Sequence, residues 1–96
     1  MTTTLNLTPE NVVIGTLYKE ADGTPHSTTY IYADIAKNDY ERDVIESQKA
    51  ILRWADTGLK RNMIEDISHN HWFYSEMIVV AENITFEEAQ AIIDLA

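Results

Sequence analysis

The residues best suited to chemistry lie in SHNHWFYSEM, residues 68–77, where one residue separates His69 from His71. On a β-strand both imidazoles project to the same side and can share a metal ion. A zinc site needs one or two further ligands. The candidates are His26, Glu65, Asp66 and Glu76, and their spacing defines no geometry. We favour the alternative, in which residues 68–70 are a polar loop entering a strand, with no metal and no cofactor.

The aromatic residues after the histidines offer a different chemistry. Trp72 and Tyr74 fall on one face of an expected strand, and Tyr30 and Tyr32 fall on one face of an earlier strand. Tyr and Trp are enriched in protein interfaces, and a large exposed apolar patch typically marks a partner site. Two alternatives stay open: these side chains form an exposed patch, or the N-terminal segment covers them.

Other catalytic motifs are missing from the sequence. It contains no Gly-rich phosphate loop, nucleophile elbow or HExxH, and it has no cysteine to serve as a thiolate or a zinc ligand. Ser68 and His69 are only neighbours in sequence, with no positioned acid or oxyanion hole to complete a triad. We therefore expect a protein that is not an enzyme.

The expected elements begin with a β-hairpin. Residues 11–20 and 27–35 are rich in β-branched and aromatic residues, and Asp22-Gly23 between them is a strong turn signal. A long amphipathic helix should follow, capped by Asn38 and Glu41. It ends either at about residue 57, with Gly58 after it, or at about residue 63.

The last third of the chain predicts a third strand and a second helix. The strand covers residues 71–81, and the helix opens with Thr85 and Glu88 at capping-box spacing. The whole chain, residues 1–96, is then one small α+β domain with the order β-β-α-β-α. We expect a three-stranded, mainly antiparallel sheet of strand order 2-1-3, with both helices packed on the face that carries Ile31, Ala33 and Ile35. Residues 1–10 form either a flexible segment or a cover for the other face.

Negative charge is concentrated in the last third of the chain. The net charge is −9, and residues 62–96 contain seven acidic residues and no Lys or Arg. Such a field disfavours binding to nucleic acid or anionic membranes and speeds association with basic proteins. The alternative is that the acidity only maintains solubility. If it binds a partner, the expected charged contacts are Glu65, Asp66, Glu76, Glu82, Glu87 and Glu88.

In size, acidity, lack of cysteine and mixed α/β pattern, the chain resembles the small proteins of bacteriophages and mobile elements that inhibit host defence nucleases. The resemblance is one of general character and covers no particular residues. It implies an anti-CRISPR or anti-restriction inhibitor in the cytoplasm, with carboxylates docked on a basic nucleic-acid-binding surface and with aromatic anchors at Tyr30, Tyr32, Trp72 and Tyr74. No apolar run is long enough for a membrane span. Two alternatives are a homodimer joined through Tyr/Trp-rich sheet faces and a small metalloenzyme built on His69 and His71.

Overall fold

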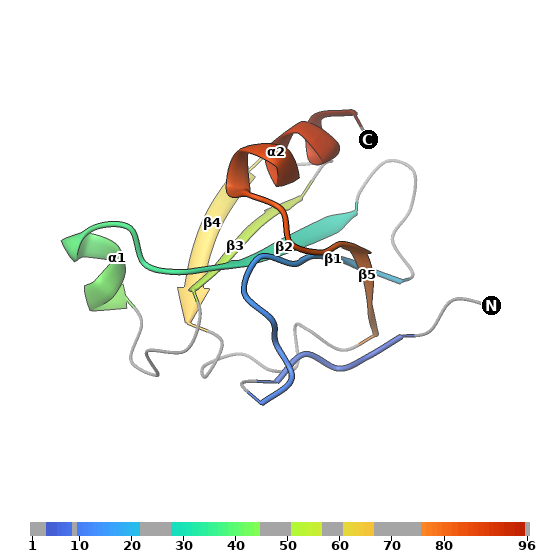
Figure 1. The fold of residues 1–96 in the computed structure, drawn as a ribbon, viewed down its shortest axis with the longest axis horizontal. Helices are drawn as coiled ribbons and strands as arrows, with labels where there is room; N and C mark the ends of the chain where they lie inside the picture. Colours follow the sequence, from blue (N-terminus) through green and yellow to red (C-terminus); the bar gives the residue numbers. More distant parts are fainter. Residues whose placement is uncertain are drawn as a thin grey trace.

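The computed structural model describes residues 4–8, 10–21, 28–44, 51–56, 61–66 and 76–95, and of Val44, Trp54, Asp56 and residues 61–66 only the backbone. The described strands form one antiparallel sheet of order β4-β3-β2-β1-β5, accompanied by two helices (Figure 1). The strands are β1 (Leu17–Glu20), β2 (Thr29–Asp34), β3 (Ile51–Asp56), β4 (Arg61–Asp66) and β5 (Met77–Ala81), and the helices are α1 (Asp39–Val44) and α2 (Phe86–Leu95). The predicted α+β class is confirmed.

The predicted N-terminal hairpin is present as β1 and β2. The two strands are antiparallel, with Leu17 opposite Tyr32 and Tyr18 opposite Ile31. β1 is shorter than the predicted residues 11–20, because Gly15 adopts a φ of 91° before it, a conformation that favours glycine. The Asp22-Gly23 turn lies outside the described residues.

The predicted long helix is wrong. α1 ends at Val44, and the segments expected to continue it are the antiparallel strands β3 and β4, with Asp56 opposite Arg61. The start of the helix was predicted correctly, since the Asn38 side chain accepts a hydrogen bond from the Glu41 amide at 2.9 Å. The Glu41 carboxylate bonds the Lys37 amide instead of the Asn38 amide.

Tertiary burial explains why β3 is a strand. It lies inside the sheet between β2 and β4, which pair with both edges of its backbone, and it is buried on both faces: Ile51 and Ala55 on one, Leu52 on the other. A strand buried on both faces has apolar residues on both sides, and over a short segment that composition also fits one face of a helix. Gly58, expected to end the helix, lies outside the described residues.

The predicted third strand is shorter than expected. β5 covers Met77–Ala81 and pairs antiparallel with β1, and residues 71–75 lie outside the described part of the chain. The predicted order 2-1-3 is present as β2-β1-β5. The prediction of three strands is wrong, because the β3–β4 hairpin extends the sheet beyond β2.

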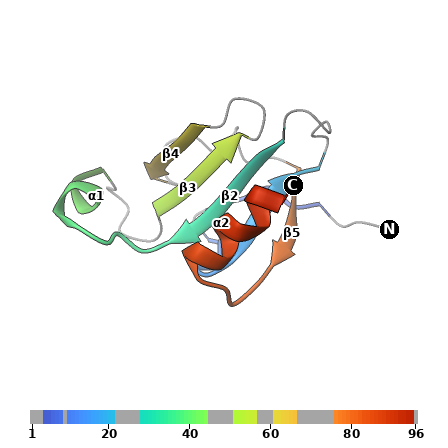
Figure 2. The same cartoon turned by 90° about the horizontal axis from the view of Figure 1, so that it is seen from above.

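One face of the sheet is covered by α2. Leu17, Tyr30 and Tyr32 pack with Ala89 of the helix, with further contacts from its apolar neighbours Ile84, Phe86, Ile92 and Ile93. The helix begins at the predicted capping box. The Thr85 amide donates to the Glu88 carboxylate at 3.0 Å, and the Glu88 amide donates to the Thr85 hydroxyl at 3.1 Å. Figure 2 shows α2 lying across the sheet.

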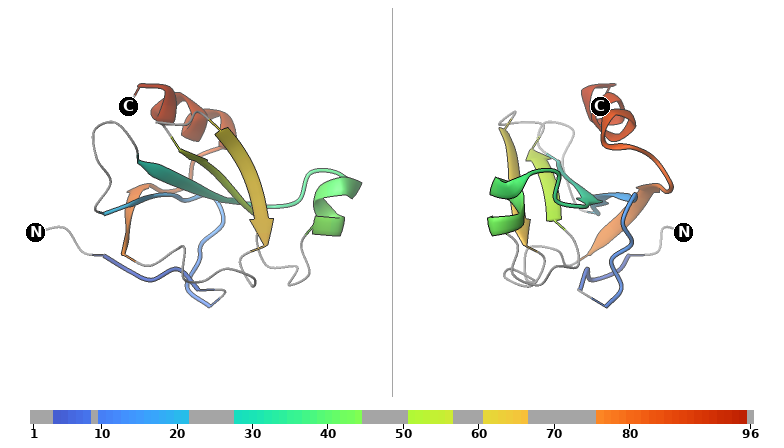
Figure 3. Two further views of the ribbon diagram at one scale, coloured as in Figure 1. Left: turned by 180° about the vertical axis from the view of Figure 1, so that it is seen from behind. Right: turned by 60° about the vertical axis from the view of Figure 1, so that its left-hand side comes forward.

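The opposite face is covered by the N-terminal segment. Leu7 is fully buried in a cluster with Tyr18, Ile31, Ala33, Leu52 and Met77, and Leu5 and Val12 pack against it. The views in Figure 3 place this segment and α2 on opposite sides of the sheet. The alternation of residues along β2 was predicted correctly, but its faces were assigned in reverse: Ile31 and Ala33 face the N-terminal segment.

Two further expectations about packing are wrong. The helices do not share a face, because α1 lies beyond the end of the sheet next to β2 and β3 (Figures 1 and 2). Ile35 is 58% exposed rather than part of the core. β2 ends one residue earlier, at Asp34, so the alternation that places residues in the core stops there.

Candidate functional site

The predicted acidic contacts fall into two groups at opposite ends of the sheet. Glu76 and Glu82 flank β5, and Glu87 and Glu88 lie in the first turn of α2, where all four are exposed. Glu65 and Asp66 belong to β4, at the other edge. β4 and β5 are four strand spacings apart, or about 19 Å at 4.8 Å each. The six residues therefore lie at two separate edges of the sheet, and their role as partner contacts stays a prediction.

The predicted aromatic anchors do not form an exposed patch in the described structure. Tyr30 is 7% exposed and Tyr32 is 4% exposed, because both lie under α2. The prediction that these two tyrosines are available to a partner or a dimer seam is wrong. Trp72 and Tyr74, and the histidine pair His69 and His71, lie outside the described residues.

The side chain of Tyr32 is tied to the start of α2. Its hydroxyl donates a hydrogen bond to the Ile84 carbonyl at 2.6 Å, and its ring centroid lies 5.9 Å from that of Phe86. Burial is the main cause that raises the pKa of Tyr32 above 10.0, and the negative charge of Asp34 adds to it. Tyr32 therefore stays protonated and holds the helix terminus against the sheet.

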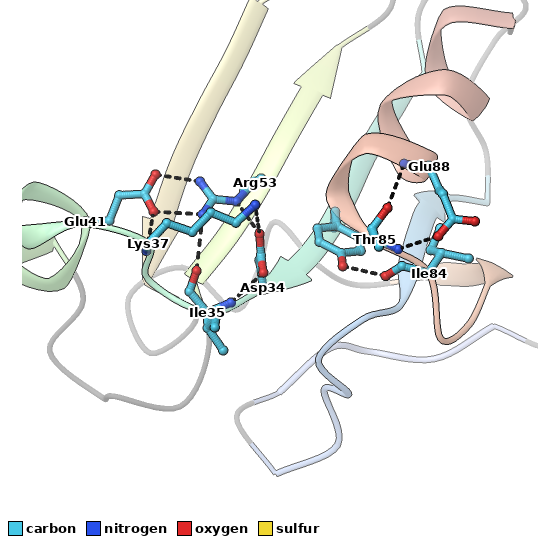
Figure 4. Close-up of polar contacts among 9 residues, drawn as sticks. Asp34, Ile35, Lys37, Glu41, Arg53, Ile84, Thr85 and Glu88 are labelled. Carbon is cyan, nitrogen blue, oxygen red and sulfur yellow. Dashed lines mark hydrogen bonds and ion pairs between the residues drawn. The ribbon is translucent and has the colours of Figure 1, made fainter.

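A network of charged residues joins α1 to the end of β2 and to Arg53 in β3 (Figure 4). The Arg53 guanidinium donates from Nε to Asp34 at 2.6 Å and from its two terminal nitrogens to Glu41 at 2.6 and 2.7 Å. It also reaches the Ile35 carbonyl at 3.2 Å, and Lys37 lies 3.5 Å from Asp34. The side chains of Arg53, Asp34 and Glu41 are only 9%, 9% and 12% exposed.

The network shifts the proton affinities of its members. Hydrogen bonds from Arg53 are the main cause that lowers the pKa of Glu41 to about 2, and bonding to Glu41 is the main cause that raises the pKa of Arg53. Both groups are therefore charged at neutral pH. Each is also occupied by its partners, which makes the network a structural joint rather than a source of a free acid or base.

Phe86 links this joint to α2. The Lys37 ammonium lies 5.2 Å from the centre of the Phe86 ring, and the Arg53 guanidinium carbon lies 5.3 Å from it. Cations at these distances are attracted to the face of an aromatic ring. The first turn of α2, with its exposed acids, is thus anchored to the same residues that anchor α1.

Sequence reasoning missed this network because it placed Arg53 in a long amphipathic helix instead of a strand. Two signals pointed to it. Asp34 ends a strand in an otherwise apolar and aromatic run, and a carboxylate buried there requires a cation. The segment ILRWAD, residues 51–56, places its polar Arg53 between apolar neighbours, which fits a strand that begins beside that carboxylate.

The exposed acids from residue 76 to residue 95 differ from the paired charges of the network. We call them the β5–α2 acids: Glu76, Glu82, Glu87, Glu88 and Asp94. Within the described structure none of them has a cationic partner, whereas Arg53, Lys37 and Arg42 each contact a carboxylate. Glu88 caps its own helix, and Asp94 accepts a hydrogen bond from Gln90 at 3.0 Å.

The described residues contain no group of three or more His, Cys, Asp or Glu arranged to hold a metal ion. Their longest helix, α2 with ten residues, is too short and too polar to cross a bilayer. Comparison of the chain with protein-family models, with curated proteins and with solved structures finds no significant match.

Proposed function

We propose that this protein is a non-enzymatic interaction module that docks its β5–α2 acids on a basic, nucleic-acid-binding surface of a partner protein and inhibits that partner. The observation that carries the proposal is the contrast in charge pairing. The cations of the Arg53 network are paired with carboxylates, while the β5–α2 acids are exposed and have no cationic partner among the described residues.

The scaffold supports this proposal by holding several carboxylates in place. Glu82 follows β5 directly, and Glu87 follows the N-cap of α2, a helix that is anchored through Tyr32 and Phe86. Carboxylates on a rigid element lose little entropy when they bind, so they can replace phosphates in a groove lined by Arg and Lys. The bound acids would exclude nucleic acid from that groove.

The test uses the protein as bait on a bacterial lysate at low salt, followed by purification of whichever basic nucleic-acid-binding protein is recovered. The test variant is Glu82→Gln with Glu87→Gln. The control is Glu10→Gln with Asp43→Asn, two exposed acids outside the β5–α2 segment. Both double variants remove two negative charges without changing side-chain size.

We expect the test variant to bind the purified partner about tenfold more weakly, with a smaller dependence on salt, and the control to bind as the unmodified protein does. The unmodified protein should also displace nucleic acid from the partner. Equal losses in the two double variants would contradict a localised docking surface. Binding that persists unchanged at 1 M salt, where the Debye length is about 3 Å, would contradict an electrostatic one.

A further inference from the structure

The outer edge of β4 has backbone groups directed away from the sheet. The direction follows from the backbone hydrogen bonds of Ala33. Its amide donates to the Thr16 carbonyl at 3.1 Å and its carbonyl accepts from the Gly15 amide at 2.8 Å, so the backbone N–H and C=O groups of Ala33 point toward β1. The direction of the N–H and C=O groups alternates along a strand, so these groups of the residues next to Ala33 in β2 point toward β3.

The observed registers carry this alternation across the sheet. Leu52 is opposite Ala33, whose backbone groups point away from β3. The N–H and C=O groups of Leu52 therefore point away from β2, toward its partner Glu65 in β4. The residues of β4 on either side of Glu65 therefore direct their N–H and C=O groups outward. These outward residues are Asn62, Ile64 and Asp66.

No described residue pairs with this edge, although the strand has charged residues of its own, Arg61, Glu65 and Asp66. The β3–β4 ladder runs through six residue pairs without a bulge. The other edge is protected in three ways: Leu5 forms two backbone hydrogen bonds of 2.9 Å with Met77, the β1–β5 register shifts, and the exposed Glu76 and Glu82 flank the strand. Covered, bulged and charged edges are how proteins prevent strand addition.

The two edges also differ in their complementarity to a second copy. Pairing β5 with itself about Val79 would place Glu76 opposite Glu82, a repulsive arrangement. In an antiparallel pair, two opposite residues either both direct their N–H and C=O groups toward the other strand or both direct them away from it. A two-fold axis between two β4 strands must therefore place a residue opposite its own copy. With the axis at Met63, Arg61 lies opposite Glu65 twice; with the axis at Ile64, Asn62 lies opposite Asp66.

We propose that the outer edge of β4 binds β4 of a second copy of this chain, antiparallel and with Met63 on the two-fold axis. The two five-stranded sheets then join into one sheet of ten strands. The contact is a single strand edge, so a weak dimer is expected, with a dissociation constant on the order of 10 to 100 µM.

The dimer goes beyond the proposed function and leaves the surface proposed there free. The two β5 strands would be the outermost of ten, nine spacings or about 43 Å apart. Each half would present its own β5–α2 acids, which makes the dimer bivalent toward a partner with two basic sites.

Sedimentation equilibrium of the full chain between about 10 µM and 1 mM tests the proposal. The unmodified protein should shift with concentration from 11.0 kDa toward twice that mass. Arg61→Glu and Glu65→Arg should each place like charges opposite each other and weaken the dimer at least tenfold. An equimolar mixture of the two variants should dimerise again, because every charged pair across the axis becomes attractive. Asp43→Lys, a two-unit charge change on α1, is the control and should dimerise as the unmodified protein does.

Amide exchange supplies a second readout that does not depend on substitution. In the unmodified protein, the amides of Asn62 and Ile64 should become protected as concentration rises, while that of Met63, which faces β3, should not change. A protein that stays monomeric at about 1 mM, a dimer that persists in Arg61→Glu, or a mixture that does not dimerise would each overturn the proposal. Because no partner protein is involved, failure here leaves the proposed function standing, and failure of partner capture leaves the dimer standing.

Discussion

Glu41→Gln removes one charge from the Arg53 network while preserving side-chain size. The carboxylate of Glu41 receives two hydrogen bonds from Arg53 and one from the Lys37 amide, and its side chain is 12% exposed. The variant leaves the Arg53 guanidinium with Asp34 as its remaining anionic partner. The expected result is a loss of folding stability at neutral pH.

The magnitude follows from the pKa of Glu41, which is lowered from 4.5 to about 2. At 1.36 kcal/mol per tenfold change in proton affinity, the ionised carboxylate contributes up to about 3 kcal/mol at pH 7. A glutamine oxygen can still accept one hydrogen bond from Arg53, and nearby solvent screens the charge. We therefore expect Glu41→Gln to lose about 2 kcal/mol, or roughly 1 to 2 M in the urea midpoint.

The dependence on pH distinguishes this charge effect from a packing defect. Because the folded pKa lies below the unfolded value, the stabilisation is fully present above about pH 5 and is lost as pH falls from about 4.5 toward 2. Urea denaturation at pH 7, 5, 4 and 3 should show the difference from the unmodified protein shrinking with acidity.

The matched control is Asp39→Asn, on the same helix. The Asp39 side chain is 95% exposed and pairs with the exposed Arg42, so no measurable loss is expected. A Glu41→Gln variant as stable as the unmodified protein at pH 7, or a difference that stays constant down to pH 3, would refute the reasoning.

Three further predictions concern the packing of the sheet. Leu7→Ala should lose about 2 to 5 kcal/mol in urea denaturation because Leu7 is fully buried, while Val13→Ala, at a site 56% exposed, should lose less than about 0.5 kcal/mol; equal losses would contradict the N-terminal cover. Thr85→Ala should lose about 1 kcal/mol because it removes the cap of α2, and an unchanged unfolding midpoint would contradict that role. Tyr32→Phe should lose about 1 to 3 kcal/mol by leaving the Ile84 carbonyl unbonded. The raised pKa of Tyr32 means that the unmodified protein should lose stability above pH 10, and a decline of the same size in Tyr32→Phe would contradict this.

The features that the sequence predicted correctly are those set by neighbouring residues. The β1–β2 hairpin depends on two β-branched and aromatic runs that are close in sequence, and its two strands pair as expected, although β1 is shorter than predicted. The caps at Asn38 and Thr85 depend on side chains that reach an amide three residues away. The excess of acid after residue 61 is a property of composition alone.

The exposure of the tyrosines could not be predicted in this way. The alternation in β2 shows that Tyr30 and Tyr32 share a face, but both faces of this strand carry residues that a core accepts. The α2 helix packs on the tyrosine face, where Tyr32 bonds the carbonyl of Ile84 just before the helix. That choice depends on a contact between residues that are 52 positions apart.

The charge distribution, the hairpin and the helix caps of this protein were thus determined by the sequence through short-range chemistry. Only the tertiary structure decided that residues 51–56 form an interior strand. Their apolar spacing satisfies a helix as well as a strand, and β2 and β4 on either side decide between the two by pairing with the β3 backbone. Asp34 and Glu41 then bind Arg53 of that strand, so the network exists only once the sheet has formed.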